Sequence, residues 1–467
     1  MKIALLFMLY YYIMNLNPSY KKFEPFTYKS LEILRKKFKN LSLDIPVSQD
    51  LGLLQKSINI KNITIPNRLS IQPMEGFDAY DDGSPGELTL RRYKRYAEGG
   101  AGLIWVEATS IAKDCRSNPH QLMLTEQNLE KFRDFVSEIR TRCNETLKSL
   151  GFEDECILII QLNHSGRYSK IGLEKFPIRA YHNANLDATI QVSEKNGKII
   201  SDDELKELED TWVSAADLAK KAGFDGVDIK ACHGYLISGL LSARNRKNSI
   251  YGGPSLENRA KFFLNIIKKL NSEIDDFIIT SRLGVYNGIP YPNGFGVKEV
   301  ENQPFPAEID LQEPIQLIKE LHKLGIRLIN ISVGNPHYTP HLTRPYDTPL
   351  KGTKLPEEHP LFSFYRIVHL TSLIKSQIPE SMVTIGSGYS YLHQFAGNIA
   401  AGLVENNMVD ICGFGRMALA NPNFPRQIFQ NGIIDKNQVC ITCSQCSGFM
   451  RQGIRTGCAI RDPQYKK

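Results

Sequence analysis

A short apolar run, a polar or glycine-marked break and a longer amphipathic stretch follow one another eight times along this chain. The apolar runs are almost continuously hydrophobic, which is typical of parallel strands buried on both faces. They begin at Leu69, Leu103, Cys156, Gly226, Phe277, Leu328, Met382 and Val409. The stretches between them carry apolar residues at helical spacing. Two of these stretches open with capping signals, SDDE at Ser201 and SLEN at Ser255.

Eight strand–helix units predict an α/β fold, a (β/α)8 TIM barrel. A doubly wound parallel sheet is the alternative. It is disfavoured because no GxGxxG follows an early strand, and because polar residues gather at the C-terminal ends of the runs, where barrels place active sites. We expect an N-terminal extension over residues 1–50 with one helix between Tyr28 and Ile45, the barrel over 51–430, and a cysteine-rich segment over 431–467.

Composition narrows the class of protein. The chain has 467 residues, of which 42% are hydrophobic, so it can build a large core. The net charge is +7, but the densest basic run is RKKFK at Arg35 to Lys39, so nucleic acid is not an expected partner. Nine cysteines, five of them scattered, indicate a reducing compartment, and we expect a cytoplasmic protein.

The first fifteen residues, MKIALLFMLYYYIMN, resemble the hydrophobic region of a signal peptide. The apolar part is too short to span a bilayer comfortably, and no small-residue cleavage site follows it. A mis-called start codon and a loosely packed terminal segment are the alternatives, so membrane attachment is not expected.

Four cysteines close together near the end of the sequence predict one shared centre: Cys440, Cys443, Cys446 and Cys458. Spacers of two residues let neighbouring thiolates converge on one metal or cluster. A structural zinc site and a pair of disulfides are the alternatives. Zinc sites usually pair two CxxC knuckles across a longer gap, whereas a compact run of three cysteines favours an iron–sulfur cluster, here taken as 4Fe-4S.

A phosphate site is expected after the last two strands. Barrels commonly bind phosphate between the loops after strands seven and eight, against backbone N–H groups and an added helix terminus. Those loops read IGSGYS and GFGRMA, in which Gly386, Gly388 and Gly415 permit close backbone approach and Arg416 supplies a positive charge. The alternative is that the glycines only serve tight turns. The ligand would be nucleotide-like.

Several motifs in barrel order resemble the old yellow enzyme flavoproteins, from about Leu54 to Asp462. They are NRLSIQPM at Asn67, GLIWVEAT at Gly102, QLNHSGR at Gln161, HGYL at His233, NSIYGGPSLENRAKF at Asn248, SRLG at Ser281 and GFGR at Gly413, with the terminal cysteine set. Within that family the chain is most similar to the cluster-bearing branch that includes 2,4-dienoyl-CoA reductase and trimethylamine dehydrogenase.

The resemblance implies FMN at the mouth of the barrel. Arg282 would lie beside the flavin pyrimidine, where reduction places negative charge, and Gln161 would contact the pyrimidine carbonyls. Pro73, Met74 and Ala108 would line the ring. Gly388, Gly415 and Arg416 would hold the phosphate.

The resemblance also implies the chemistry. A pair of donors after the fourth strand would hold the substrate oxygen, and a tyrosine would protonate carbon. These are Lys230 and His233, with Tyr235 as the proton donor. Lysine at the first donor position departs from the family, and as a fixed cation it is expected to favour an anionic substrate. His337 is a further candidate acid.

Two other departures affect the cofactors. Glu75 stands where the family more often has Thr or Cys beside the flavin, so the flavin potential should differ from that of ordinary relatives. Cluster-bearing relatives continue into FAD- and pyridine-nucleotide-binding domains that are not found in this sequence. Electrons would therefore come directly from NAD(P)H or from a separate donor protein.

The sequence thus predicts an FMN- and cluster-containing oxidoreductase that reduces an activated C=C bond of a small molecule. Oxidation of an amine is the competing enzymatic hypothesis, disfavoured because Lys230 would repel a cationic amine. A non-catalytic electron-transfer flavoprotein, with zinc in place of the cluster, is the second alternative. The oligomeric state is left open.

Overall fold

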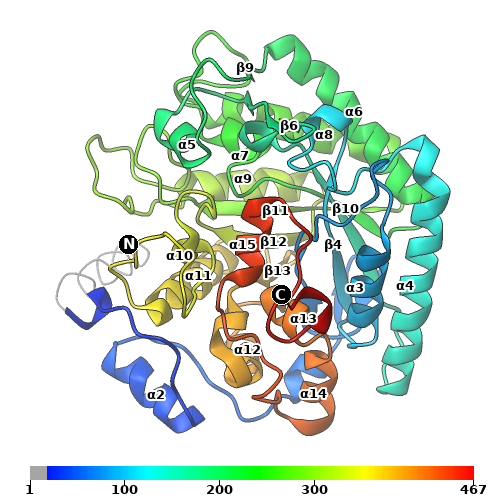
Figure 1. The fold of residues 1–467 in the computed structure, drawn as a ribbon, viewed down its shortest axis with the longest axis vertical. Helices are drawn as coiled ribbons and strands as arrows, with labels where there is room; N and C mark the ends of the chain where they lie inside the picture. Colours follow the sequence, from blue (N-terminus) through cyan, green and yellow to red (C-terminus); the bar gives the residue numbers. More distant parts are fainter. Residues whose placement is uncertain (1–17, 467) are drawn as a thin grey trace.

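The computed structural model describes residues 18–466, and its centre is a closed barrel of eight parallel strands (Figure 1). The strands are β3 (Leu69–Ile71), β4 (Leu103–Ser110), β5 (Ile157–Asn163), β10 (Gly226–Ile229), β11 (Ile278–Tyr286), β12 (Leu328–Val333), β13 (Val383–Gly386) and β14 (Ile411–Phe414). Each strand overlaps one predicted apolar run. The predicted barrel is confirmed, and the doubly wound alternative is wrong.

An outer layer of helices follows the strands in turn. The helices are α3 (Glu87–Ala97), α4 (Leu129–Ser149), α6 (Asp202–Lys221), α8 (Leu256–Glu273), α9 (Gln312–Lys323), α11 (Pro360–Lys375), α12 (Ala396–Glu405) and α14 (Phe424–Asn431). Both predicted caps are confirmed. Ser201 and Glu204 form a capping box on α6, and the Ser255 side chain accepts a hydrogen bond from Asn258 N on α8.

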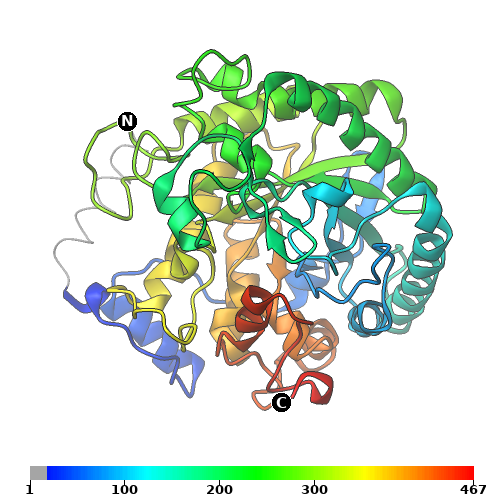
Figure 2. The same cartoon turned by 45° about the horizontal axis from the view of Figure 1, so that its top comes forward.

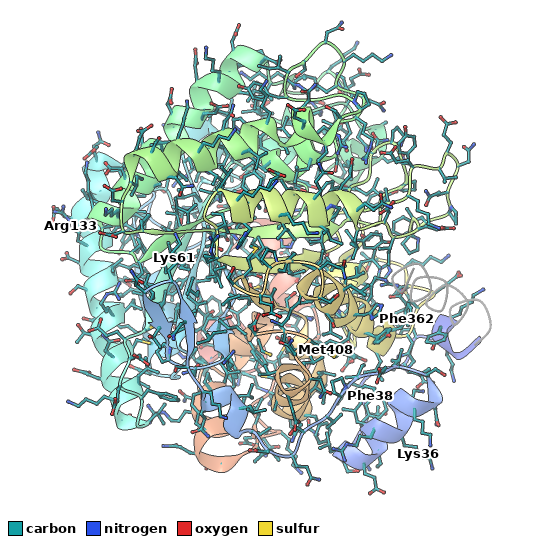
Figure 3. All side chains as sticks on the ribbon, turned by 180° about the vertical axis from the view of Figure 1, so that it is seen from behind. Lys36, Phe38, Lys61, Arg133, Phe362 and Met408 are labelled. Atoms are coloured by element: carbon teal, nitrogen blue, oxygen red, sulfur yellow. The ribbon has the colours of Figure 1, made fainter. Side chains whose placement is uncertain are left out.

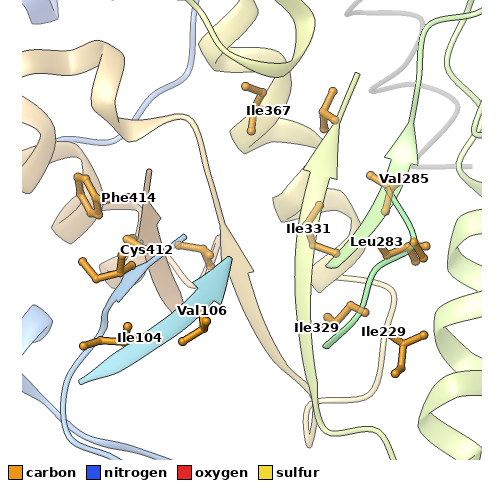
Figure 4. Packing of buried hydrophobic residues seen from close by; sticks show 14 of the residues in the cluster. Ile104, Val106, Ile229, Leu283, Val285, Ile329, Ile331, Ile367, Cys412 and Phe414 are labelled. Carbon is orange, nitrogen blue, oxygen red and sulfur yellow. The ribbon is translucent and has the colours of Figure 1, made fainter. Parts of the chain in front are cut away.

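Alternating side chains of the strands build two cores. On β4, Ile104 and Val106 point outward into the layer between strands and helices (Figure 4). Leu103 and Trp105 belong to a second cluster that fills the barrel. The antiparallel hairpin of β1 (Ile58–Ile60) and β2 (Ile63–Ile65) contributes buried isoleucines to this inner cluster. The hairpin therefore closes one end of the barrel, and a binding site must lie at the other.

The N-terminal extension packs on the barrel helices. Its helix α2 (Leu31–Asn40) is shorter than the predicted span, because Ser30 caps its start and Ser42 adopts a left-handed φ of 49° just after its end. Leu34 and Phe38 of α2 are buried, and Figure 3 shows this helix from behind. The signal-like residues 1–17 lie outside the described part. Within residues 18–466, no helix has both the length and the apolar character needed to cross a membrane.

The cysteine-rich segment folds back onto the carboxyl ends of the barrel strands (Figures 1 and 2). Ser444 donates a hydrogen bond to the Thr348 carbonyl at 2.7 Å, and helix α15 (Gln445–Gln452) follows. Thr456 N donates to Gly76 O, just after β3, at 2.7 Å. Asp462 accepts two hydrogen bonds from Arg91 of α3, at 2.8 and 2.9 Å. These contacts fix the four cysteines beside the open end of the barrel.

Candidate active site

A cavity of about 520 Å³ opens at the carboxyl ends of the strands. Its walls come from strand β11, from the loops after β3, β4, β10, β12, β13 and β14, from the insertion between β5 and α6 (residues 164–200, "the insertion" below), and from α15. Most of the predicted site residues line it: Pro73, Met74, Glu75, Lys230, His233, Tyr235, Arg282, Gly388, Gly415 and Arg416. A volume of this size suits a cofactor or a small ligand.

Two predicted residues lie behind the wall instead of on it. The Ala108 carbonyl accepts a hydrogen bond from Gln121 Nε2 at 3.0 Å. Gln161 Nε2 donates to Asp228 Oδ2 at 2.6 Å, and the other Asp228 oxygen accepts the Arg282 backbone N–H at 2.6 Å. Burial raises the pKa of Asp228 to about 6. Asp228 therefore fixes the strand that carries Arg282, and direct contact of Ala108 or Gln161 with a flavin stays a prediction.

Arg282 supplies a buried positive charge at the inner part of the cavity. It is 9% exposed, and within residues 18–466 its Nε finds no hydrogen-bond partner. Burial lowers the pKa of its guanidinium without removing the charge. A buried cation with a free donor needs an acceptor. The position suits the electron-rich edge of a bound ring.

His233 and Tyr235 are the two donors beside that cation. His233 lies in the left-handed region with φ 64°, in the turn directly after β10, and its Nε2 is 2.9 Å from Ser332 Oγ. Burial lowers the pKa of His233 and raises the pKa of Tyr235. At neutral pH the imidazole is therefore uncharged and the phenol keeps its proton. A protonated phenol can serve as a general acid.

Lys230 and Glu75, the two departures from the family pattern, form a buried pair. Lys230 Nζ lies 3.9 Å from Glu75 Oε1 and 3.8 Å from the centre of the Tyr235 ring. Each residue is 6% exposed. Burial raises the pKa of Glu75 and lowers the pKa of Lys230. Lys230 is thus not an isolated cation, which weakens the expectation that it selects anionic substrates.

His337 also lines the cavity and stacks on Tyr168, with ring centres 3.7 Å apart. Its ring also meets that of Tyr235 edge-on, at 6.1 Å. Burial, assisted by the charge of Arg451, lowers the pKa of His337 to about 3. The imidazole is therefore neutral at physiological pH and shapes an aromatic wall.

Two arginines meet at the glycine-lined part of the cavity. Arg416 Nη2 donates to the Pro345 carbonyl at 2.7 Å, while its Nη1 and the Nη1 of Arg344 are buried without a partner in the described residues. Burial and the neighbouring Arg416 lower the pKa of Arg344 to about 10. A Cβ on Gly415 would lie 3.0 Å from Met74 Sδ, so a side chain there would require the methionine to shift. Two guanidinium groups, each with a buried Nη1 that lacks a partner in the described residues, fit a phosphate.

The four predicted cysteines line one small second cavity, and Arg416 lies in the walls of both cavities. All four are free thiols in the structure. Backbone N–H groups point at two of the sulfurs: Thr442 N lies 3.4 Å from Cys440 Sγ, and Arg461 N lies 3.3 Å from Cys458 Sγ. Such bonds commonly tune cluster thiolates. Within residues 18–466, no three His, Cys, Asp or Glu side chains are grouped so as to hold a single metal ion.

Sequence reasoning missed several residues of the site. Arg344 could have been found, because it is a cation in the connection between the sixth strand and the next long helix, at the carboxyl ends of the strands. Gln72, on the cavity wall, exchanges hydrogen bonds with Asn330 of β12 at 2.8 and 3.2 Å, and it was visible as a polar residue in a buried strand. Met450 and Arg451 of α15 also line the cavity. No pattern in the sequence indicates that α15 would reach it.

Known proteins share this sequence pattern and this architecture. Residues 54–435 match the family model described as NADH:flavin oxidoreductase / NADH oxidase family. An NADH oxidase of Thermoanaerobacter brockii is 26% identical over 406 residues, covering 86% of this chain and 54% of the relative. A 2-naphthoyl-CoA reductase complex (TM-score 0.67, 19% identity) and histamine dehydrogenase from Rhizobium sp. 4-9 (TM-score 0.65, 19% identity) each cover 89% of this chain. The chain spans only 58% and 53% of those two structures.

Proposed function

Since this chain belongs to the NADH:flavin oxidoreductase / NADH oxidase family, and is therefore an oxidoreductase, we propose that it binds FMN and a 4Fe-4S cluster and reduces an activated C=C bond. The barrel over residues 51–430 would hold FMN, and residues 431–467 would hold the cluster. Electrons would come from NAD(P)H or from a separate donor protein, in the cytoplasm.

One observation carries the flavin proposal. A single cavity joins an inner cation, Arg282, to an outer pair of arginines, Arg344 and Arg416, whose Nη1 atoms lack a partner in the described residues. A mononucleotide flavin has the matching ends, an electron-rich ring edge and a phosphate. Met74 and Pro73 line the cavity as well. FMN, when bound, would supply the hydride.

The protein's own residues would handle the substrate oxygen and the proton. His233 is neutral, and its Nε2 can accept a hydrogen bond from the Ser332 hydroxyl. The other ring nitrogen then carries the proton and can donate a hydrogen bond to a carbonyl oxygen. Tyr235 keeps its proton, as required of the group that protonates carbon. The aromatic wall of Tyr168 and His337 would exclude water above them.

The cluster proposal is supported by the four cysteines around one small cavity and by the N–H groups aimed at Cys440 and Cys458. The ligands of a four-iron cluster bind four different irons, so they do not converge on one point as ligands of a single ion do. Arg416, shared by the two cavities, would bring the cluster close to the flavin phosphate region.

The Glu75–Lys230 pair changes one argument about the substrate. With Glu75 at 3.9 Å, Lys230 no longer repels a cationic amine as a bare charge would. Amines therefore belong in the substrate panel beside enoates, enones and enoyl-thioesters.

The test is direct. A visible spectrum of the anaerobically purified protein should show flavin bands with a broad cluster shoulder, and analysis should find about four iron and four acid-labile sulfide per chain. NAD(P)H or a low-potential donor should then drive reduction of an enoate, enone or enoyl-thioester. One zinc without sulfide would refute the cluster. A protein that binds no flavin, or that turns over only amines, would refute the proposed reaction.

A further inference from the structure

We propose that Lys170 and Lys175 form a subsite for a phosphate group at the opening of the cavity. This inference rests on the proposed function, because it concerns a ligand that enters the same cavity. Both lysines line the cavity, Lys170 half-buried and Lys175 exposed. They lie on the insertion, a different segment of the cavity wall from the loops that carry the arginines assigned to the flavin phosphate.

The two lysines face each other across a small hairpin. Strands β6 (Lys170–Ile171) and β7 (Glu174–Lys175) pair antiparallel, with Lys170 directly opposite Lys175. Like charges at directly opposed positions destabilise a strand pair. The hairpin itself gains nothing from this arrangement, which indicates that the second charge serves something other than folding.

No carboxylate compensates the pair. Within residues 18–466, neither ammonium group has an Asp or Glu oxygen within 4.0 Å. Lys175 Nζ donates instead to the Ile190 carbonyl at 2.7 Å, which holds it against the cavity and leaves its other protons free. Burial, with the charge of Lys175, lowers the pKa of Lys170. An anion between the two lysines would offset both the cost of burying the charge of Lys170 and the repulsion between the two ammonium groups.

The surrounding wall points to the same ligand chemistry. Ser169, next to Lys170, is 1% exposed and lines the cavity, and its Oγ has no partner in the described residues. Glu75 is the one carboxylate among the described residues of the cavity wall, and it pairs with Lys230. The opening is therefore positive, and the residue next to Lys170 adds a hydroxyl without a partner in the described residues. A doubly charged phosphate or a pyrophosphate matches this set better than a single carboxylate.

Two kinds of molecule could bring that phosphate. One is the nicotinamide nucleotide that donates hydride, and the other is a substrate with a phosphate-bearing handle, such as a nucleotide thioester. Both must pass the insertion to reach the inner cavity. The experiment below separates them.

The FMN-loaded protein would be compared with the variants Lys170→Gln, Lys175→Gln and their combination. Flavin reduction would be followed by anaerobic stopped-flow with NADH, NADPH and the uncharged donor N-benzyl-dihydronicotinamide. Reoxidation would be followed with an enoyl-thioester that carries phosphates and with a short neutral enone. Lys170→Arg keeps the charge. Lys61→Gln in the turn of the β1–β2 hairpin, on the rear side of the molecule seen in Figure 3, removes a lysine far from the opening.

Loss of a charged contact to phosphate should raise the half-saturating concentration of the phosphate-bearing reactant by roughly tenfold or more. The uncharged donor and the enone should be unaffected, as should Lys61→Gln, and Lys170→Arg should restore binding. An effect on NADH and NADPH assigns the subsite to the hydride donor, and an effect on the thioester assigns it to the substrate. Equal losses for charged and uncharged reactants, or none for either phosphate-bearing reactant, would overturn the proposal. Reduction of the wild-type flavin by the uncharged donor tests the proposed function separately.

Discussion

Breaking the Glu75–Lys230 pair tests how this chain tolerates two buried charges beside its cavity. At 3.9 Å and an effective dielectric constant of about 20, the attraction between the two charges is about 4 kcal/mol. Removing one partner should cost about 3–5 kcal/mol, because the other charge stays buried without compensation. We therefore expect Glu75→Gln and Lys230→Met each to lower the free energy of unfolding by roughly 3 kcal/mol.

The double variant should behave differently. The pKa of Glu75 is raised from its ordinary value of 4.5, so the stabilisation linked to this shift is complete below pH 4.5 and is lost as the pH rises. The pKa of Lys230 is lowered from its ordinary value of 10.5, so the linked stabilisation is complete above pH 10.5 and is lost as the pH falls. At neutral pH both shifts therefore report a cost of holding the charged forms in the interior. Glu75→Gln with Lys230→Met removes both costs at once. Its free energy of unfolding should lie within about 1 kcal/mol of the wild type, or above it.

Urea unfolding of the four proteins at pH 7 measures this cycle. Trp105 and Trp212, the two tryptophans of the chain, are both fully buried and report unfolding by fluorescence. A matched control cycle is Asp217→Asn with Lys221→Met, an exposed pair on α6 at 2.7 Å, which should couple by less than about 1 kcal/mol. If the two single losses at Glu75 and Lys230 simply add in the double variant, the two residues do not act as a pair and the reasoning fails.

Three further results are expected. Tyr235→Phe should leave flavin reduction by NAD(P)H nearly unchanged and slow reoxidation by an enoate roughly 10²-fold or more, measured by stopped-flow; equal slowing of both half-reactions would remove its acid role. Cys443→Ser should abolish the cluster absorbance and one-electron reduction by a low-potential donor, while hydride reduction of FMN survives, and an unchanged iron content would contradict the ligand assignment. Burial lowers the pKa of His337 to about 3, so its stabilising contribution is complete above pH 6.5 and is lost as the pH falls from 6.5 toward 3. His337→Phe should therefore lose less stability than the wild type between pH 6.5 and 4, by roughly 1.4 kcal/mol per pH unit, and parallel curves in urea unfolding would argue against burial of a neutral ring.

The barrel was predictable because its evidence is local. Each buried strand is a near-continuous apolar run, and caps such as Ser201 and Ser255 mark where helices begin. In a barrel the carboxyl ends of all strands meet at one face, so residues at those ends could be expected to share a cavity. This reasoning found Arg416, the resemblance to a known family supplied Arg282, and both line the same cavity.

The partnerships could not be predicted, because they depend on side-chain direction across the barrel. Lys230 and Glu75 belong to loops far apart in the sequence, and nothing local indicates that one lies 3.9 Å from the other. Gln161 turns toward Asp228 for the same kind of reason, since a buried carboxylate attracts the nearest donor. The path of α15 depends on contacts such as Thr456 with Gly76, which have no sequence signature.

The hairpin of β1 and β2 has a kinetic consequence. Because it closes one end of the barrel and the inner core fills the interior, both reactants of the proposed reaction would enter the cavity at the carboxyl ends of the strands. If both reactants occupy the same part of the cavity, the electron donor would have to leave before the acceptor binds. Double-reciprocal plots of the steady-state rate against donor concentration, at several fixed acceptor concentrations, should then be parallel lines, the pattern of a ping-pong enzyme. Each reactant in excess should also inhibit by occupying the cavity in the wrong half of the cycle.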